Sequence, residues 1–201
     1  MSIKINYSNK IISKPLINQV MFVEENFSIS AIKKHLSNTE FSYINDLLKK
    51  SDLKKNLLFF EINSKKTIFL VSIKKNFETS DIESLGAEFH SHIDYKRQNE
   101  YFIITDSIEN KYETFLGYFL HGLKLKSYEF NIYKSKKDNR TISINVIGNK
   151  SKLTTQNELR FKAIEEGTFF ARDLVSEPPN VLNPKEYVNR LLKLRKLGIK
   201  V

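Results

Sequence analysis

The stretch NLLFFEINSKKTIFLVSI, residues 56–73, decides the fold class of this chain. Its two apolar runs, 56–62 and 67–73, are rich in the β-branched and aromatic residues that favour strands. The polar residues 63–66 between them have the length and composition of a hairpin turn. We therefore expect two antiparallel strands here, and the rest of the chain must supply the elements that cover them.

The segment after this hairpin has apolar residues at helical spacing, which predicts a helix. Its apolar stripe is Ile82, Leu85, Phe89 and Ile93. Ser80 and Glu83 have the spacing of a capping box at the start of this helix. A short strand is expected at 101–105, and Asp106 with Glu109 is expected to cap the helix after it. The stripe of that second helix is Tyr112, Phe115, Leu116, Phe119 and Leu123.

The remaining elements continue the alternation of strands and helices. Further strands are expected at 19–23 and 141–147, and short helical segments at 30–34 and 40–50. Alternating strands and helices predict an α/β fold with a mixed sheet flanked by helices.

The best-defined predicted helix covers 155–176, with Thr155 and Glu158 as its expected capping box. Its expected packing face is Leu159, Ala163, Gly167, Phe170, Ala171 and Leu174, whose small members would allow close approach to a neighbour. Pro178 ends it, and Asn183 caps a further helix. We expect an α/β domain at 1–176, and at 177–201 a linker and the opening elements of a second domain, including the start of a strand at 199–201.

The formal net charge is +10, which would suit a nucleic-acid or an anionic membrane partner. Only six of the 33 basic residues are Arg, however, and the readout of bases and phosphates depends on the bidentate Arg fork. The favoured interpretation is a solvated basic surface, and the alternative is a polyanion site.

Composition excludes several classes of site and partner. The chain has no Cys, which rules out disulfides, thiol catalysis and Cys-based metal sites. No apolar run reaches the roughly 18 residues of a membrane span, and Met1–Asn6 lacks the apolar core of a signal peptide. The Gly residues 86, 117, 122, 148, 167 and 198 lack the spacing of a phosphate-binding loop. We expect a cytoplasmic protein without a membrane partner.

No set of His or acidic residues predicts a catalytic or metal site. His90 and His92 are two residues apart, on different faces of a helix, and His35 and His121 stand alone. The acidic pairs are Glu24–Glu25, Glu109–Glu113 and Glu165–Glu166. Adjacent carboxylates do not converge on a helix, and one i,i+4 pair is an incomplete metal site. We expect no catalytic residue and no metal ligand in this chain, and structural roles for the histidines.

Aromatic and basic residues are interleaved after residue 122. Tyr128, Phe130 and Tyr133 lie among five lysines, which are Lys124, Lys126, Lys134, Lys136 and Lys137. Such a segment can bind single-stranded nucleic acid, because bases stack on aromatic rings and lysines attract phosphates. The favoured alternative is an edge strand whose alternate aromatics pack inward.

The segment 171–184, ARDLVSEPPNVLNP, resembles the linker signature of the leucyl aminopeptidase (cytosol aminopeptidase) family. That signature is A-R-D-L-V-N-x-P-P-N-x-x-x-P, and this sequence has Ser176 where Asn is usual. A second stretch, GLKLKSYEFNIYK at 122–134, is similar to the family's G-x-x-L-x-x-Y-x-F-x-x-Y-K. The structural residues matched in the linker signature are Arg172, Asp173, Pro178, Pro179, Asn180 and Pro184.

The resemblance implies an N-terminal domain similar in fold to macro domains, joined by the linker to a catalytic domain. In that family the catalytic domain binds two divalent metals, Zn or Mn, through motifs such as N-T-D-A-E-G-R, and the enzymes are hexamers. No such motif occurs before Val201, so no catalytic residue, metal ligand or cofactor is carried over to this chain. ADP-ribose binding is not implied, because the glycine loops that hold its phosphates are missing.

We therefore expect the non-catalytic N-terminal domain of a leucyl aminopeptidase-like metallo-exopeptidase, cut just after the linker, with a role in packing, assembly or regulation. Its expected partners are the missing catalytic domain and further copies in a hexamer, and peptide substrates would bind only the parent enzyme. One alternative is a nucleic-acid-binding regulatory module, a role found in some bacterial relatives, although DNA is not the favoured partner. Another is an unrelated interaction domain.

Overall fold

One six-stranded mixed sheet forms the centre of the molecule. The computed structural model describes residues 2–8, 17–94, 99–108, 114–135, 140–148 and 153–201. The strand order is β1-β6-β5-β2-β4-β3, and every neighbouring pair is parallel apart from the antiparallel pair β3 and β4. The strands are β1 (Ser2–Ser8), β2 (Asn18–Glu24), β3 (Leu57–Asn63), β4 (Lys66–Ile73), β5 (Glu100–Ile104) and β6 (Thr141–Ile147).

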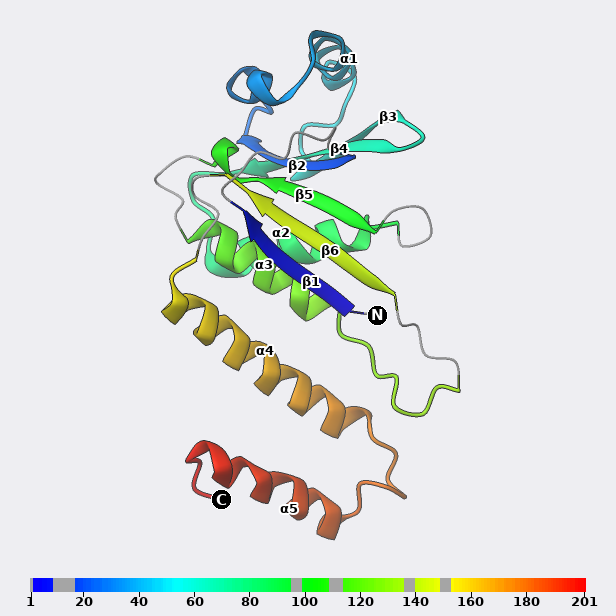
Figure 1. Cartoon of the computed structure of the whole chain (residues 1–201), viewed down its shortest axis with the longest axis vertical. Coiled ribbons are helices and arrows are strands. Elements are labelled where there is room, and N and C mark those ends of the chain that lie inside the picture. Colours follow the sequence, from blue (N-terminus) through cyan, green and yellow to red (C-terminus); the bar gives the residue numbers. More distant parts are fainter. Residues whose placement is uncertain (1, 9–16, 95–98, 109–113, 136–139, 149–152) are drawn as a thin grey trace.

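Helices cover both faces of the sheet, so the α/β prediction with a mixed, flanked sheet is confirmed. Figure 1 shows α1 on one side, α2 and α3 on the other, and α4 and α5 farther out beyond α3. The α-helices are α1 (Asn38–Leu48), α2 (Thr79–Ser91), α3 (Phe115–Lys126), α4 (Thr155–Ser176) and α5 (Pro184–Leu192). The described residues also form 3-10 helices at Ser30–His35 (η1), Thr105–Ser107 (η2) and Lys193–Leu197 (η4). None of the described helices is long and apolar enough to cross a membrane.

Two apolar cores lie on the two faces of the sheet. Phe22 of β2 packs in the core beneath α2 and α3, with Phe89 and Phe119. Its neighbour Met21 packs in the opposite core, with Ile44 of α1. Because β2 is buried on both faces, its sequence reads as a continuous apolar run rather than as an alternating one.

Two glycines allow α2 and α3 to pack at very short range. A Cβ atom on Gly86 would lie 1.9 Å from the carbonyl oxygen of Phe119, and one on Gly122 would lie 1.9 Å from that of Glu83. No side chain fits at either position. The close approach that the sequence predicts at Gly167 of α4 is wrong, since nothing lies within 4 Å of its Cβ position.

The small-residue face predicted for α4 is exposed over most of its length. Leu159, Ala163, Gly167 and Ala171 face solvent, and α4 packs on α3 through Phe161 instead. A stripe of small residues and an exposed stripe have the same period. Only the position of the neighbouring helix decides which face is covered.

Capping residues differ from those predicted for α2 and α4. The α2 capping box uses Glu78 and Asp81, not Ser80 and Glu83, because a carboxylate can accept the same backbone N–H as a hydroxyl. The residue that caps α4 is Thr154, whose hydroxyl accepts from the N–H of Asn157. The predicted box of Thr155 and Glu158 starts one residue too late.

The predicted cap of α3 is also wrong. Asp106 lies in η2, and α3 begins after Thr114 without a side-chain cap. Glu109 and Tyr112 lie outside the described residues, as do Glu113, Lys136 and Lys137.

Three strand assignments need correction. The segment 2–8 forms β1, which pairs with β6, although it was not predicted as a strand. The segment 128–133 forms no edge strand, since its tyrosines bond to α4 and the chain after it. Residues 199–201 form no strand either.

The likeness of this fold to macro domains, which the family resemblance implies, stays a prediction.

Candidate functional site

The connections that leave the sheet diverge beside β2. The chain after β2 passes to η1 and α1 on one face, whereas the chain after β4 and after β5 passes to α2 and α3 on the other. In open α/β sheets such a switch of direction leaves a crevice at the carboxyl ends of the strands, where ligands bind. The topology therefore predicts a ligand site at the carboxyl ends of β2, β4 and β5.

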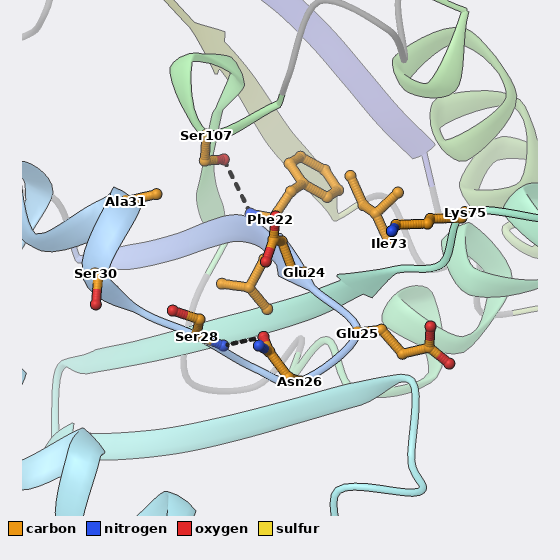
Figure 2. Close-up of a pocket in the computed structure, with 11 residues that line it drawn as sticks. Phe22, Glu24, Glu25, Asn26, Ser28, Ser30, Ala31, Ile73, Lys75 and Ser107 are labelled. Carbon is orange, nitrogen blue, oxygen red and sulfur yellow. Dashed lines mark hydrogen bonds between the residues drawn. The ribbon is translucent and has the colours of Figure 1, made fainter.

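A hollow of about 450 Å³ lies at this position. Figure 2 shows its lining, which comes from the end of β2 and the loop after it, the start of η1, the end of β4 and the segment after it, and η2. The lining residues are Phe22, Val23, Glu24, Glu25, Asn26, Ser28, Ser30, Ala31, Ile73, Lys75 and Ser107. We refer to this set as the switch-point hollow.

The loop that forms one wall of the hollow has a fixed backbone. The N–H of Phe27 donates to the carbonyl of Glu24 over 2.8 Å, and that of Ser28 donates to Oδ1 of Asn26 over 2.9 Å. Phe27 has a positive φ of 55°, an uncommon conformation for a bulky residue, and its ring is buried in the core on the α1 side. Burial of this ring holds the loop in place.

Ser107 ties the opposite wall of the hollow to the sheet. Its hydroxyl accepts the N–H of Phe22 over 2.9 Å (Figure 2). The same hydroxyl donates to the carbonyl of Ile104 over 2.6 Å. One side chain thus satisfies a backbone group of β2 and one of β5. Ser107 and Lys75 were not singled out from the sequence, because they lie far apart along the chain and meet only through the crossovers of the sheet.

The hollow carries charge of both signs over an apolar floor. Phe22 is 1% exposed and Ile73 is 7% exposed, whereas Glu24, Glu25 and Lys75 are exposed at the rim. The adjacent pair Glu24 and Glu25, predicted to be unfit for catalysis as a pair, thus lines the same hollow as Lys75, a basic residue that follows β4. The arrangement can bind a small ligand.

The histidines occupy structural positions. Nδ1 of His121 lies 2.8 Å from Oε1 of Glu83, which joins α3 to α2, and its ring lies 5.2 Å from that of Phe161. His92 ends α2 with its ring 5.1 Å from that of Phe59.

His35 and His90 are half-buried or buried side chains, and burial lowers the pKa of both imidazoles. Among the described residues, no group of three or more His, Asp or Glu side chains comes together as a metal site requires.

The remaining acidic candidates lie on α4. Glu165 is 3.8 Å from the amine of Lys124, which also donates to the carbonyl of Ile3 over 2.8 Å. Glu166 pairs with Lys162 one turn away on the exposed face. The two carboxylates therefore point to different neighbours and form no acid–base pair.

The two stretches that resemble the aminopeptidase family lie against each other. Nη1 of Arg172 donates to the carbonyl of Leu125 over 2.6 Å, and its guanidinium lies 5.5 Å from the ring centre of Tyr128. The Tyr128 hydroxyl donates to Oδ1 of Asp173 over 2.7 Å. The end of α4 is thus fixed to the segment that follows α3.

The proline-rich segment forms a turn between α4 and α5. The carbonyl of Pro178 accepts the N–H groups of Val181 and Leu182, each over 2.9 Å. Pro179 and Asn180 are exposed in this turn. Asn183 then accepts the N–H of Glu186 over 3.0 Å, and Pro184 is the first residue of α5, as expected from the sequence.

Glu177 joins this turn to both of its neighbours. Its carboxylate accepts the Tyr133 hydroxyl and, over 2.8 Å, Nη1 of Arg190 from α5. The hydrogen bond from Tyr133 and then that from Arg190 lower the pKa of the Glu177 carboxyl. The same contact raises the pKa of Tyr133.

A mixed sheet with helices on both faces is followed by α4, of 22 residues, and by the shorter α5, of 9 residues. The curated relatives of this chain are cytosol aminopeptidases. "Probable cytosol aminopeptidase 1" of Shewanella oneidensis is 26% identical over 155 residues, which are 76% of this chain and 30% of that protein. The "Probable cytosol aminopeptidase" of Phytoplasma mali is 40% identical over 89 residues, 41% of this chain and 18% of that protein. These names confirm the resemblance read from the sequence, although no protein-family model matches the chain.

Solved structures with the same fold are leucine and cytosol aminopeptidases. A mutant of tomato leucine aminopeptidase superposes with a TM-score of 0.67 at 15% identity, covering 98% of this chain and 42% of that one. The cytosol aminopeptidase from Coxiella burnetii gives 0.61 at 11% identity, covering 94% and 37%. At these identities the likeness shows the fold alone. The matched segments span 30% or less of the length of the curated relatives named above.

Proposed function

We propose that this chain is the N-terminal domain of a leucyl aminopeptidase-type metallo-exopeptidase, a cytoplasmic enzyme that removes N-terminal amino acids from peptides. In this proposal the domain serves packing, assembly or regulation and does not catalyse. The observation that carries it is the contact between the two family-like stretches, made by Arg172 with Leu125 and by Asp173 with Tyr128. Residues that define the family's linker here fix the direction in which α4 leaves the domain.

A packing role is supported by the apolar side chains that α4 and the residues after it expose. Leu159 is 64% exposed, Val175 is 88% exposed and Leu197 is 75% exposed. Neither α4 nor α5 has a buried residue. Such side chains suit contact with a catalytic domain and with further copies in a hexamer.

The two divalent metals of the proposed enzyme, Zn or Mn, are assigned to the catalytic domain. The residues described here do not fit them, since no three potential ligands come together. Within the proposal, the peptide substrate also binds only that catalytic domain.

The direct test is hydrolysis of leucine p-nitroanilide by the purified 201-residue chain with Mn²⁺ or Zn²⁺. We expect no metal-dependent turnover, while a full-length cytosol aminopeptidase assayed in parallel is active. Turnover that needs the metal and survives repurification would contradict a non-catalytic role. The reading frame downstream of Val201 supplies the second test, since the proposal requires an N-T-D-A-E-G-R-like segment there.

Nucleic-acid binding remains the alternative function, and the net charge of +10 favours it. The aromatic residues that suggested it are less suitable than the sequence implied. Tyr128 and Tyr133 donate their hydroxyls to carboxylates, of Asp173 and Glu177, and a phosphate backbone would be repelled there. Binding to a DNA duplex whose log affinity falls linearly with log salt would support this alternative. No binding at low salt would remove it.

A further inference from the structure

We propose that the switch-point hollow binds a small zwitterion with an apolar side chain, such as free leucine or a leucyl dipeptide. The shared chemistry is an ammonium group, a carboxylate and an aliphatic side chain within one small molecule. The lining of the hollow provides a complementary group for each of these three parts.

The floor of the hollow suits an aliphatic side chain. Phe22 and Ile73 are buried at 1% and 7% exposure, and Val23 is buried at 6%. They contribute apolar surface at the base of a hollow of about 450 Å³, which falls in the range of about 300–1,000 Å³ for small-molecule sites.

The rim of the hollow suits the two charges of a zwitterion. Glu24 and Glu25 provide carboxylates, and Lys75, in the segment that follows β4, provides an ammonium group. Within the described part of the chain, none of these three side chains takes part in an ion pair. A ligand ammonium can therefore bind the carboxylates, and a ligand carboxylate can bind Lys75, without breaking an existing pair.

The charge balance of the rim disfavours an anionic ligand. The chain as a whole is strongly basic, at +10, yet this rim has two carboxylates and one lysine. No glycine lines the hollow, so it lacks the close-approach backbone of a phosphate loop. The lining thus selects a ligand with a cationic group over a nucleotide.

The hollow is preformed rather than assembled by the ligand. The turn from Glu24 to Phe27 is closed by a 2.8 Å hydrogen bond, and Ser107 holds the ends of β2 and β5 together. A preformed site does not lose affinity to the ordering of its own loops. The hydroxyls of Ser28 and Ser30 lie on the wall formed by the chain after β2 and supply further polar partners for a ligand (Figure 2).

The lining defines a small zwitterion with an apolar side chain, and the choice of leucine among such ligands rests on the proposed function. If both proposals hold, the domain senses the product or the substrate of its own enzyme. Free leucine corresponds to the product, and the dipeptide Leu-Gly corresponds to the substrate. Since the chain tested has no proposed catalytic site, binding and hydrolysis are separate measurements and each can fail alone.

The experiment is a calorimetric titration of the 201-residue chain with four probes. L-leucine and Leu-Gly both carry the complete zwitterion, N-acetyl-leucine lacks the ammonium, and leucinamide lacks the carboxylate. We expect saturable binding of leucine or Leu-Gly, and whichever binds more tightly identifies the source of the ligand. Each incomplete probe should bind about tenfold more weakly or worse, the equivalent of one charge-assisted hydrogen bond.

Variants locate the binding in the hollow. The double substitution E24Q/E25Q should weaken the binding of leucine about tenfold but leave the binding of N-acetyl-leucine unchanged. K75Q should likewise weaken the binding of leucine about tenfold but leave the binding of leucinamide unchanged. Glu61→Gln and Lys65→Gln, on the exposed β3–β4 hairpin, are the matched controls. No saturable binding of either zwitterion, equal binding of N-acetyl-leucine, or equal losses in the control variants would overturn the proposal.

Discussion

The hydroxyl of Tyr128 donates a hydrogen bond of 2.7 Å to Oδ1 of Asp173, 45 residues farther along the chain. Burial, and then the hydrogen bond to Asp173, raises the pKa of the Tyr128 phenol. The ring also lies 5.2 Å from that of Phe169 on the same helix. Together with the hydrogen bond from Arg172 to the Leu125 carbonyl, this pair anchors the last turns of α4, a helix that has no buried residue.

Substitution of Tyr128 by Phe should loosen the end of α4 without unfolding the sheet. It removes one hydrogen bond to a carboxylate at a partly exposed site, so we expect a loss of about 1 kcal/mol. In the variant, the amides of residues 170–176 should exchange hydrogen faster than they do in the unmodified chain. The amides of β2 and β5 should exchange at an unchanged rate. Tyr43→Phe, at an exposed residue of α1, is the matched control and should change neither quantity.

Arg172 should stabilise the protein partly through its contact with Tyr128, so its contribution should be smaller when Tyr128 is absent. Its guanidinium both donates to the Leu125 carbonyl and lies over the Tyr128 ring, whereas a lysine at this position would keep only the charge. We expect Arg172→Lys to destabilise the protein, with a coupling of about 0.5–1 kcal/mol to Tyr128→Ala in a double-mutant cycle. Urea unfolding measures it. Additive effects, or an equal loss in the control Arg160→Lys on the exposed side of α4, would show that the contact is unimportant.

The sequence predicts five of the six strands, and three of these, β2, β4 and β5, are buried on both faces of the sheet. The apolar runs of β2 and β4 are continuous for this reason, and they were located to within about two residues. β1 was missed as a strand although polar and apolar residues alternate along it, and its parallel partner β6 begins 139 residues later at Thr141. The alternation marks a strand but does not say which distant segment pairs with it.

The candidate site was less predictable than the fold. Glu24 and Glu25 were examined as an acidic pair, but their relation to Lys75 and Ser107 depends on the order of β2, β4 and β5 in the sheet. No spacing along the chain encodes that order. The linker residues are the opposite case, because a continuous motif with two prolines and an N-cap defines its own local geometry.

The glycines of α2 and α3 provide a sharp test of packing. Gly86→Ala or Gly122→Ala would place a methyl group 1.9 Å from a carbonyl oxygen of the facing helix, so the helices must separate. We expect losses of about 3 kcal/mol or more in urea unfolding. Gly167→Ala on α4 has nothing within 4 Å and should stabilise by about 1 kcal/mol through helix propensity alone. Equal effects at all three positions would show that α2 and α3 do not pack as described.

The contact of Glu177 with Tyr133 and Arg190 should make the docking of α5 sensitive to acid. These partners hold the pKa of the Glu177 carboxyl below its ordinary value of 4.5, so the ionised form favours the docked state. The stabilisation is therefore complete above pH 4.5 and is lost as the pH falls through the lower pKa of the docked state.

Limited proteolysis between α4 and α5, followed from neutral pH downwards with an acid-tolerant protease, measures this loss. Cleavage near residues 178–183 should rise as the pH falls below 4.5 in the unmodified chain. In Glu177→Gln it should already be raised at neutral pH and change little on acidification. Glu166→Gln, which removes an exposed i,i+4 pair with Lys162, should behave as the unmodified chain does. If Glu177→Gln keeps the full pH dependence, another carboxyl controls the docking of α5.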